Sequence, residues 1–191
     1  RVMVETAELA LKTAISTITN DISTSTVGAA VETAIKNRGF RPISNLTGHS
    51  VGRYLIHAGK SIPNTHQTSL SKLHTGEIYA IEPFVTVREA AGVVEDYPQK
   101  TIFRLVKAKA AKSPYAKQLT KFIEENFFTL PFAERWLQGA VPAEKYKDAF
   151  KELLSTKTIM SYPVFVEVTR NAVAQAEHTI IVKEDGCTVL T

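Results

Sequence analysis

Cysteine is nearly absent from the sequence, since Cys187 is the single one among 191 residues. An internal disulfide needs two cysteines and a cysteine-based metal site needs several, so both are excluded. The neighbours Gly186 and Thr188 offer no group that would lower the pKa of the thiol. We therefore interpret Cys187 as a small strand residue and not as a nucleophile.

Long apolar runs are also lacking. No stretch approaches the ~20 apolar residues that a membrane-spanning helix requires. The first residues, RVMVETAELA, lack the basic start and the long apolar segment of a secretory signal. These absences predict a cytoplasmic protein without a membrane partner.

Charge of one sign is not in large excess, because 23 Lys and Arg face 19 Asp and Glu for a net charge of +4. The densest basic stretch runs from Lys107 to Lys121. Its composition is typical of a helix with one solvated basic face, and a nucleic-acid patch is the alternative interpretation. We therefore expect no specific nucleic-acid partner.

Length and composition are those of a globular protein. Hydrophobic residues make up 44% and charged residues 22% of the chain, which is ordinary, and 191 residues can bury a substantial core. The sequence begins with Arg1, inside a helix-forming stretch, where a complete protein would begin with methionine. We therefore expect the chain to be a piece of a longer polypeptide.

Two helices are predicted at the start of the chain. Apolar residues between Val4 and Ile18 recur at spacings of three, four and seven, which indicates an amphipathic helix. Thr26 is expected to cap a second helix over residues 27–37. Gly39 then stands where a residue in the left-handed conformation commonly ends a helix.

The rest of the chain alternates between two patterns. Residues 77–85 are typical of a strand, whereas residues 108–158 carry apolar side chains at helical spacing. Strand patterns return at residues 164–168 and 176–183, and residues 184–186 form the turn of a closing hairpin. This order predicts a helical insertion within a sheet domain. The predicted parts are 1–107, 108–161 and 162–191.

Two histidines stand out in the segment before the first strand pattern. Gly48 lets the backbone approach a neighbour closely, so His49 could reach a buried ligand. His57 follows Tyr54, Leu55 and Ile56 in an alternating pattern, which predicts a strand with His57 on the same face as Leu55. For each histidine taken alone, a hydrogen-bonded or packed structural role is the commoner interpretation.

Two glutamates lie in otherwise apolar strand patterns. Glu82 is flanked by Ala80, Ile81, Pro83 and Phe84, and Glu177 precedes the apolar run that ends in Ile181. An ionised carboxylate in such surroundings is costly unless a Lys, an Arg or a metal ion compensates it. Carboxylate and imidazole ligands without a thiolate suit Mn²⁺, Co²⁺, Fe²⁺ or Zn²⁺.

Four segments together resemble the type II methionine aminopeptidases in their archaeal form. They are the histidine segment NLTGHSVGRYLIHAGKSIPN, the glutamate strand GEIYAIEPF, the helical stretch FTLPFAERWL and the terminal strand AQAEHTIIV. The order and spacing agree, because Glu82 lies 33 residues after His49 and Glu177 lies 95 after Glu82. The resemblance implies an α+β fold, the C-terminal half of a pita-bread (creatinase/aminopeptidase-like) fold with an inserted helical subdomain.

The resemblance also implies a metal-dependent aminopeptidase that removes the initiator methionine from nascent proteins. His49 and Glu82 would bind one divalent ion, and Glu177 would bridge two ions, which could be Co, Mn, Fe or Zn. His57 would be the catalytic histidine that contacts the scissile amide of the substrate. Ile56, Phe84 and Tyr162 would form walls of the methionine pocket. Work on nascent chains would bring the protein close to the ribosome.

Two departures from the family bear on these expectations. The aromatic residue that usually precedes the last glutamate is Ala176 here. The family's two aspartate ligands and its first substrate-binding histidine belong to an N-terminal half that this sequence does not contain. We therefore expect the chain to be active only with that half, held covalently or as a separate partner.

Two other functions are weighed against this one. A non-catalytic pita-bread homologue that binds RNA or protein partners would have no reason to keep His49, His57, Glu82 and Glu177. The related proline-releasing enzymes, the prolidases, are disfavoured by the long helical block between the two glutamates.

Overall fold

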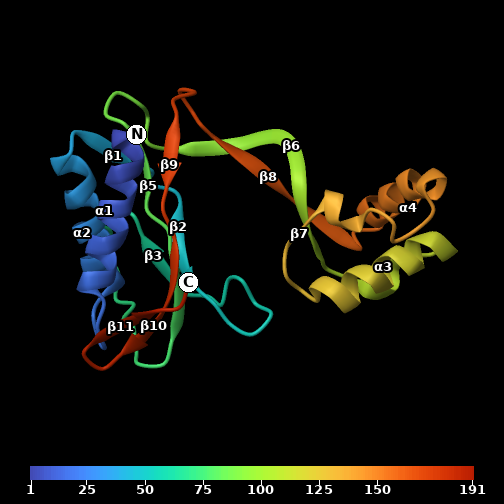
Figure 1. The fold of residues 1–191 in the computed structure, drawn as a ribbon, viewed down its shortest axis with the longest axis horizontal. Helices are drawn as coiled ribbons and strands as arrows, with labels where there is room; N and C mark the ends of the chain where they lie inside the picture. Colours follow the sequence, from blue (N-terminus) through green and yellow to red (C-terminus); the bar gives the residue numbers. More distant parts are fainter. The chain divides into compact units, whose positions relative to one another are not determined.

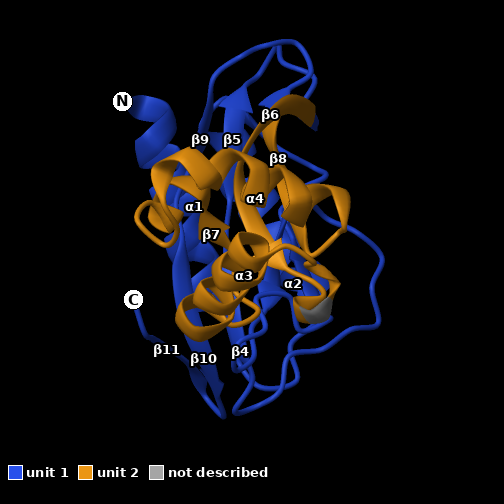
Figure 2. Cartoon of the chain, turned by 90° about the vertical axis from the view of Figure 1, so that its right-hand side faces the viewer, with its two compact units in different colours: residues 1–95, 166–191 blue, residues 96–165 orange. Residues whose placement is uncertain are grey.

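The computed structural model describes residues 1–108 and 110–191, which form two compact units (Figure 2). The first unit comprises residues 1–95 and 166–191, and the second comprises residues 96–165. The helical block expected at 108–161 lies within the second unit. No helix among the described residues is long and apolar enough to cross a membrane.

Two helices, α1 (Val2–Thr17) and α2 (Thr24–Asn37), lie side by side against the strands of the first unit (Figure 1). The buried face of α1 includes Ala7, Ala10 and Ala14, at the helical spacing of three and four. These alanines belong to the core of the first unit, and both predicted helices are present.

The cap predicted for α2 is wrong. The N-cap is Ser23, whose Oγ accepts a hydrogen bond from the backbone N–H of Ser25 at 3.2 Å, so the helix begins at Thr24 and Thr26 lies in its first turn. Residues 23–26 are all Ser or Thr, so each of them is a suitable cap by type. Gly39 has φ of +80°, as predicted for the residue after the helix.

The strands of the first unit form two antiparallel sheets. One has the order β1-β5-β9, with β1 (Phe40–Pro42), β5 (Phe84–Val87) and β9 (Val173–Gln175). The other has the order β11-β10-β4-β2-β3, with β2 (Thr47–Ser50), β3 (Ser61–Pro63), β4 (Ile78–Ile81), β10 (His178–Lys183) and β11 (Gly186–Val189).

Two chain segments pass from one sheet into the other. The first runs through β4 and β5, and the second runs in the opposite direction through β9 and β10. Ile81 pairs with His178 in one sheet, and Phe84 pairs with Gln175 in the other. The same register therefore holds on both sides of the short break between the sheets.

The core of the first unit lies between its helices and its sheets. Tyr79, Ile81 and Ile180 are fully or almost fully buried there, together with the alanine face of α1. Cys187 on β11 packs against this core and is half-buried, and burial raises the pKa of its thiol. The interpretation of Cys187 as a strand residue is confirmed.

The second unit has its own core. Its sheet has the order β7-β6-β8, with β6 (Val94–Leu105), β7 (Phe132–Ala133) and β8 (Ile159–Glu167). Its helices are α3 (Pro114–Phe127), the short 3-10 helix η2 (Glu134–Leu137) and α4 (Ala143–Ser155). Ser113 caps α3, because its Oγ accepts a hydrogen bond from the N–H of Ala116 at 3.3 Å. Leu119, Ile123 and Leu153 are fully buried in the core.

A buried carboxylate fastens the end of β8 to the segment before β6. Glu167 is 2% exposed and accepts hydrogen bonds from the N–H groups of Gly92, Thr169 and Asn171 and from the Thr169 hydroxyl. Burial by itself would raise the pKa of this carboxyl, but the hydrogen bonds outweigh it and the pKa is lowered. The sequence pattern did not single out Glu167.

Replacing Glu167 by Gln should destabilise the protein at pH 7, because the neutral amide is a weaker acceptor than the carboxylate. Since the pKa of Glu167 is lower in the folded protein, Glu167 contributes fully to the free energy of unfolding above about pH 4.3, the ordinary pKa of a glutamate. It is lost as the pH falls through the folded value. Thermal unfolding should therefore show a lower midpoint for E167Q at pH 7 and a difference that disappears in acid. An equal difference at every pH, or the same loss in the exposed control Glu89→Gln, would contradict this assignment.

Candidate metal centre

Glu82 and Glu177 face each other at the break between the two sheets of the first unit. Glu82 and Pro83 separate β4 from β5, and Ala176 and Glu177 separate β9 from β10. The register on either side of the break places Glu82 opposite Glu177. Like charges in such a position destabilise a sheet unless something compensates them.

The break itself has a local cause in the sequence. Pro83 has no N–H to donate to a ladder, so regular pairing stops there. The expectation that Glu82 lies inside a continuous apolar strand is therefore wrong, because β4 ends at Ile81 and β5 begins at Phe84. Glu177 directly precedes β10, as predicted from its place before an apolar run, but it is exposed although its surroundings were expected to be apolar.

His49 lies in β2, directly opposite Ala80 of β4. Its Nε2 is 3.0 Å from Oε1 of Glu82, and the two side chains are 13% and 16% exposed. The hydrogen bond to Glu82 raises the pKa of His49, although burial opposes the change. The structure thus brings together two of the three residues that were predicted to bind metal.

The close approach of β2 to β4 depends on Gly48. A Cβ at this position would lie 2.5 Å from the carbonyl oxygen of Ala80 and 3.3 Å from Cα of Ile81. Only glycine fits such a gap without a shift of the backbone. The prediction that Gly48 allows a close backbone approach beside His49 is confirmed.

A glutamine links the two carboxylates. Nε2 of Gln175 lies 3.0 Å from Oε2 of Glu82 and 3.2 Å from Oε2 of Glu177. The pKa of Glu177 is raised, because partial loss of hydration of its carboxylate and the negative charge of Glu82 both disfavour the ionised form, whereas His49 opposes both effects. The sequence analysis missed Gln175, although its spacing of two from Glu177 places both side chains on one face of an extended chain.

The donor set at this place suits a divalent cation. It combines an imidazole nitrogen with two facing carboxylates, which are ligands that Mn²⁺, Co²⁺, Fe²⁺ and Zn²⁺ accept. Within the described part of the chain, no group of three or more His, Cys, Asp or Glu is already arranged to hold an ion. His49 and Glu82 bond to each other instead. His49, Glu82 and Glu177 therefore remain predicted ligands.

His57 lies beside His49, in the loop of residues 51–60 between β2 and β3. The two ring centroids are 4.2 Å apart and the rings meet edge to face at 70°. The strand predicted for this segment is wrong, because Gly52 and Leu55 form a tight turn and Tyr54 has φ of +54°. The apolar alternation is too short to outweigh this turn.

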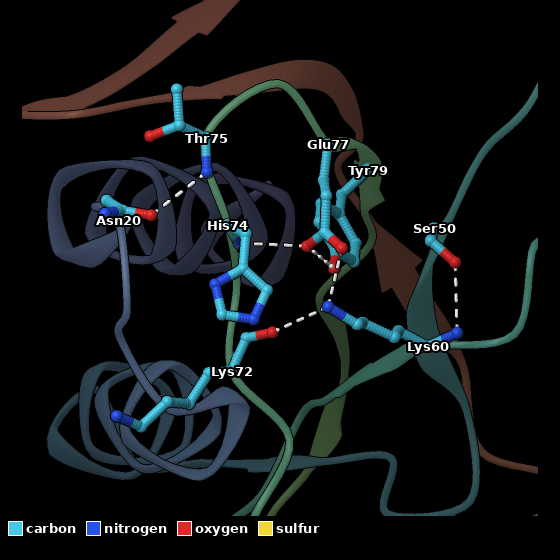
Figure 3. A network of polar contacts seen from close by, with 8 residues as sticks. All are labelled: Asn20, Ser50, Lys60, Lys72, His74, Thr75, Glu77 and Tyr79. Atoms are coloured by element: carbon cyan, nitrogen blue, oxygen red, sulfur yellow. Dashed lines mark hydrogen bonds and ion pairs between the residues drawn. The ribbon is translucent and has the colours of Figure 1, made fainter.

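Hydrogen bonds of Ser50 close the loop of residues 51–60, which carries His57. Its N–H donates to the carbonyl oxygen of Lys60 at 2.8 Å, and its own carbonyl oxygen accepts from the N–H of Ala58 at 2.8 Å. The Ser50 hydroxyl oxygen also accepts from the N–H of Lys60 at 3.0 Å (Figure 3). Because Ser50 directly follows His49, these bonds couple the position of His57 to that of His49.

The side chain of Lys60 links this loop to the segment that leads into β4. Its Nζ donates to Oε1 of Glu77 at 2.6 Å and to the carbonyl oxygen of Lys72 at 2.9 Å (Figure 3). Oε2 of Glu77 accepts from the Tyr79 hydroxyl at 2.7 Å and from the N–H of His74 at 2.9 Å. Burial alone would raise the pKa of Glu77, but these donors lower it.

The residues predicted for the methionine pocket lie in different units. Ile56 is half-buried in the loop of residues 51–60, and Phe84 is the half-buried first residue of β5. Tyr162 lies on β8 in the second unit. Phe84 therefore lies two residues from Glu82 in the same unit, whereas Tyr162 belongs to the other unit.

Comparison with known proteins shows the family to which the chain belongs. The model of metallopeptidase family M24 matches residues 1–184, so the chain belongs to this family. The methionine aminopeptidases of Methanothermobacter thermautotrophicus and Pyrococcus horikoshii are each 40% identical to it over 99% of its length. The chain spans 62% of the first of these relatives and 64% of the second.

Solved structures show the same fold. A thermophilic Arx1 matches with a TM-score of 0.75 and 16% identity, over 96% of this chain and 56% of that one. The methionine aminopeptidase from Thermotoga maritima matches with a TM-score of 0.54 and 21% identity, over 98% of this chain and 49% of that one. The predicted pita-bread fold, with its mixture of helices and sheets, is confirmed.

The Lys60–Glu77 pair should be energetically coupled. Both side chains are only about one-third exposed, at 33% and 31%, and Glu77 holds further donors in place. A double-mutant cycle of Lys60→Met and Glu77→Gln, measured by denaturant unfolding, should give a coupling of about 1 kcal/mol. The more exposed pair Lys72–Asp21, whose charged atoms are 2.9 Å apart against 2.6 Å in Lys60–Glu77, is the control and should give less. Equal coupling in both pairs would contradict a role for the partly buried position.

Proposed function

We propose that this chain is the part of a methionine aminopeptidase that supplies His49, Glu82 and Glu177 as metal ligands. The observation that carries the proposal is the contact of His49 with Glu82, with Glu177 facing Glu82 across the break between the sheets. Membership of a metallopeptidase family supports it. Relatives about 40% identical to the chain carry the name methionine aminopeptidase.

The carboxylates supply the negative charge that the centre needs. Two divalent ions, Co, Mn, Fe or Zn, would lower the pKa of a bound water and polarise the scissile carbonyl group. Glu82 and His49 would hold one ion. Glu177 would lie between two ions, where its charge reduces the repulsion of the cations.

His57 and the apolar residues would act on the substrate. His57, next to His49, would donate a hydrogen bond to the scissile amide of the substrate and stabilise the charge that develops there. Ile56 and Phe84 would contribute apolar surface to the pocket that accepts the methionine side chain. The substrates would be the N-terminal methionyl peptides of nascent proteins, in the cytoplasm and close to the ribosome.

A complete centre would need further ligands. The curated relatives are longer than the chain, which spans 62% to 64% of them. We infer that two aspartate ligands and the family's first substrate-binding histidine come from an N-terminal portion corresponding to this additional length. That portion could be covalently attached or could associate as a separate piece.

Ion binding by the 191-residue chain tests the ligand assignment. We expect one divalent ion, held weakly, because two carboxylates and one imidazole form only part of a coordination shell. Titration with Co²⁺ or Mn²⁺ in a calorimeter should show this site, and Glu82→Gln or Glu177→Gln should abolish it. Glu89→Gln, on an exposed segment, should leave it intact. Unchanged binding in both site variants would refute the assignment.

Peptidase activity tests the division of the centre. The chain alone should not hydrolyse a Met-Ala peptide, whereas a protein joined to the N-terminal portion of an archaeal relative should do so. In the joined protein, His57→Ala should lower kcat by about 10²–10³-fold with little loss of metal, because His57 contacts the substrate and not the ions. Cleavage by the purified chain alone would contradict the proposed need for additional ligands.

A further inference from the structure

Gln175 occupies an unusual place beside the candidate centre. It is the last residue of β9, and Phe84 pairs with it on β5. Its side-chain amide lies within hydrogen-bonding distance of one oxygen from each facing carboxylate, at 3.0 Å from Glu82 and 3.2 Å from Glu177. An amide nitrogen carries two hydrogens, so it can serve both acceptors at the same time.

We propose that Gln175 is a positioning residue that holds Glu82 and Glu177 in the arrangement that receives a divalent ion. This inference rests on the proposed metal site. It assigns to Gln175 no contact with the ion and no part in the chemistry.

The contacts of Glu82 divide between its two oxygens. Oε1 faces Nε2 of His49 at 3.0 Å, and Oε2 faces Nε2 of Gln175 at 3.0 Å. The carboxylate plane is therefore fixed from both sides. Gln175 fixes Glu177 at the same time, so a single side chain sets the separation of the two carboxylates.

The backbone of Gln175 belongs to a paired strand, whereas Glu82 and Glu177 lie outside the strands. Glu82 and Glu177 lie in the break between the sheets, where Pro83 cannot donate to a ladder. Gln175 lies in the last regular pair before that break, opposite Phe84. The β5–β9 ladder therefore holds the backbone of Gln175 in place, and the Gln175 side chain holds two carboxylates that lie outside this ladder.

The chemical type of this residue suits a cation site. Two facing carboxylates could be stabilised more strongly by a lysine or an arginine, but a fixed positive charge would oppose the arrival of a metal ion. A neutral amide donates hydrogen bonds to both carboxylates and leaves their negative charge available to attract a metal ion. Residues that orient metal ligands in this way typically change affinity by about 10–100-fold when they are replaced.

Two replacements of Gln175 separate positioning from general stability. Gln175→Leu removes both donors, so the metal-free protein should unfold at a lower temperature in EDTA and should bind Co²⁺ about 10–100-fold more weakly. Gln175→Lys supplies a charged donor, so the metal-free protein should become more stable while Co²⁺ affinity falls at least as far. Gln67→Leu, which removes an exposed amide in the same unit, is the control and should change neither quantity.

The outcomes distinguish this inference from the proposed function. If the unsubstituted chain binds Co²⁺ and Gln175→Leu binds it equally well, the positioning role is refuted and the metal site stands. If Co²⁺ affinity follows thermal stability in both variants, rising in Gln175→Lys, Gln175 has a structural role only and the inference is overturned. If the unsubstituted chain takes up no Co²⁺, the proposed metal site itself fails.

Discussion

One antiparallel register governs the candidate centre. Because Ile81 pairs with His178 and Phe84 with Gln175, the glutamates between these pairs must face each other. Two facing carboxylates repel, and the chain offsets this repulsion with the His49 imidazole and the Gln175 amide. A divalent cation would offset the charge that remains, which is why a costly arrangement is reasonable in a metallopeptidase.

The rest of the first unit holds other groups close to this pair. Gly48 allows β2 to approach β4 closely enough for His49 to reach Glu82. Ser50 and Lys60 fasten the loop that carries His57, and Glu77 ties that loop to β4 through Lys60. The helices α1 and α2 cover the strands with a small-residue face and supply the core on which this arrangement rests.

Where the sequence analysis was wrong, a competing local preference or a distant partner decided the outcome. His57 was expected in a strand because apolar and polar residues alternate there, but the turn between Gly52 and Leu55 prevents extended pairing. The cap of α2 could not be chosen among four consecutive Ser and Thr residues. Glu177 was expected in apolar surroundings, but it is exposed in the break between β9 and β10.

The sequence by itself determined the two N-terminal helices, the turn at Gly39, the close approach at Gly48 and the family. Each of these depends on the spacing of nearby residues or on the order of short motifs. Only the tertiary structure decided that Glu82 opposes Glu177, that Gln175 joins them, and that Lys60 and Glu167 are held by distant groups. The physical reason is that the contacts of Gln175 with Glu82, of Glu167 with Gly92 and of Lys60 with Glu77 join residues far apart in the chain. Strand register and hydrogen bonds between such residues leave no periodic signal in the sequence.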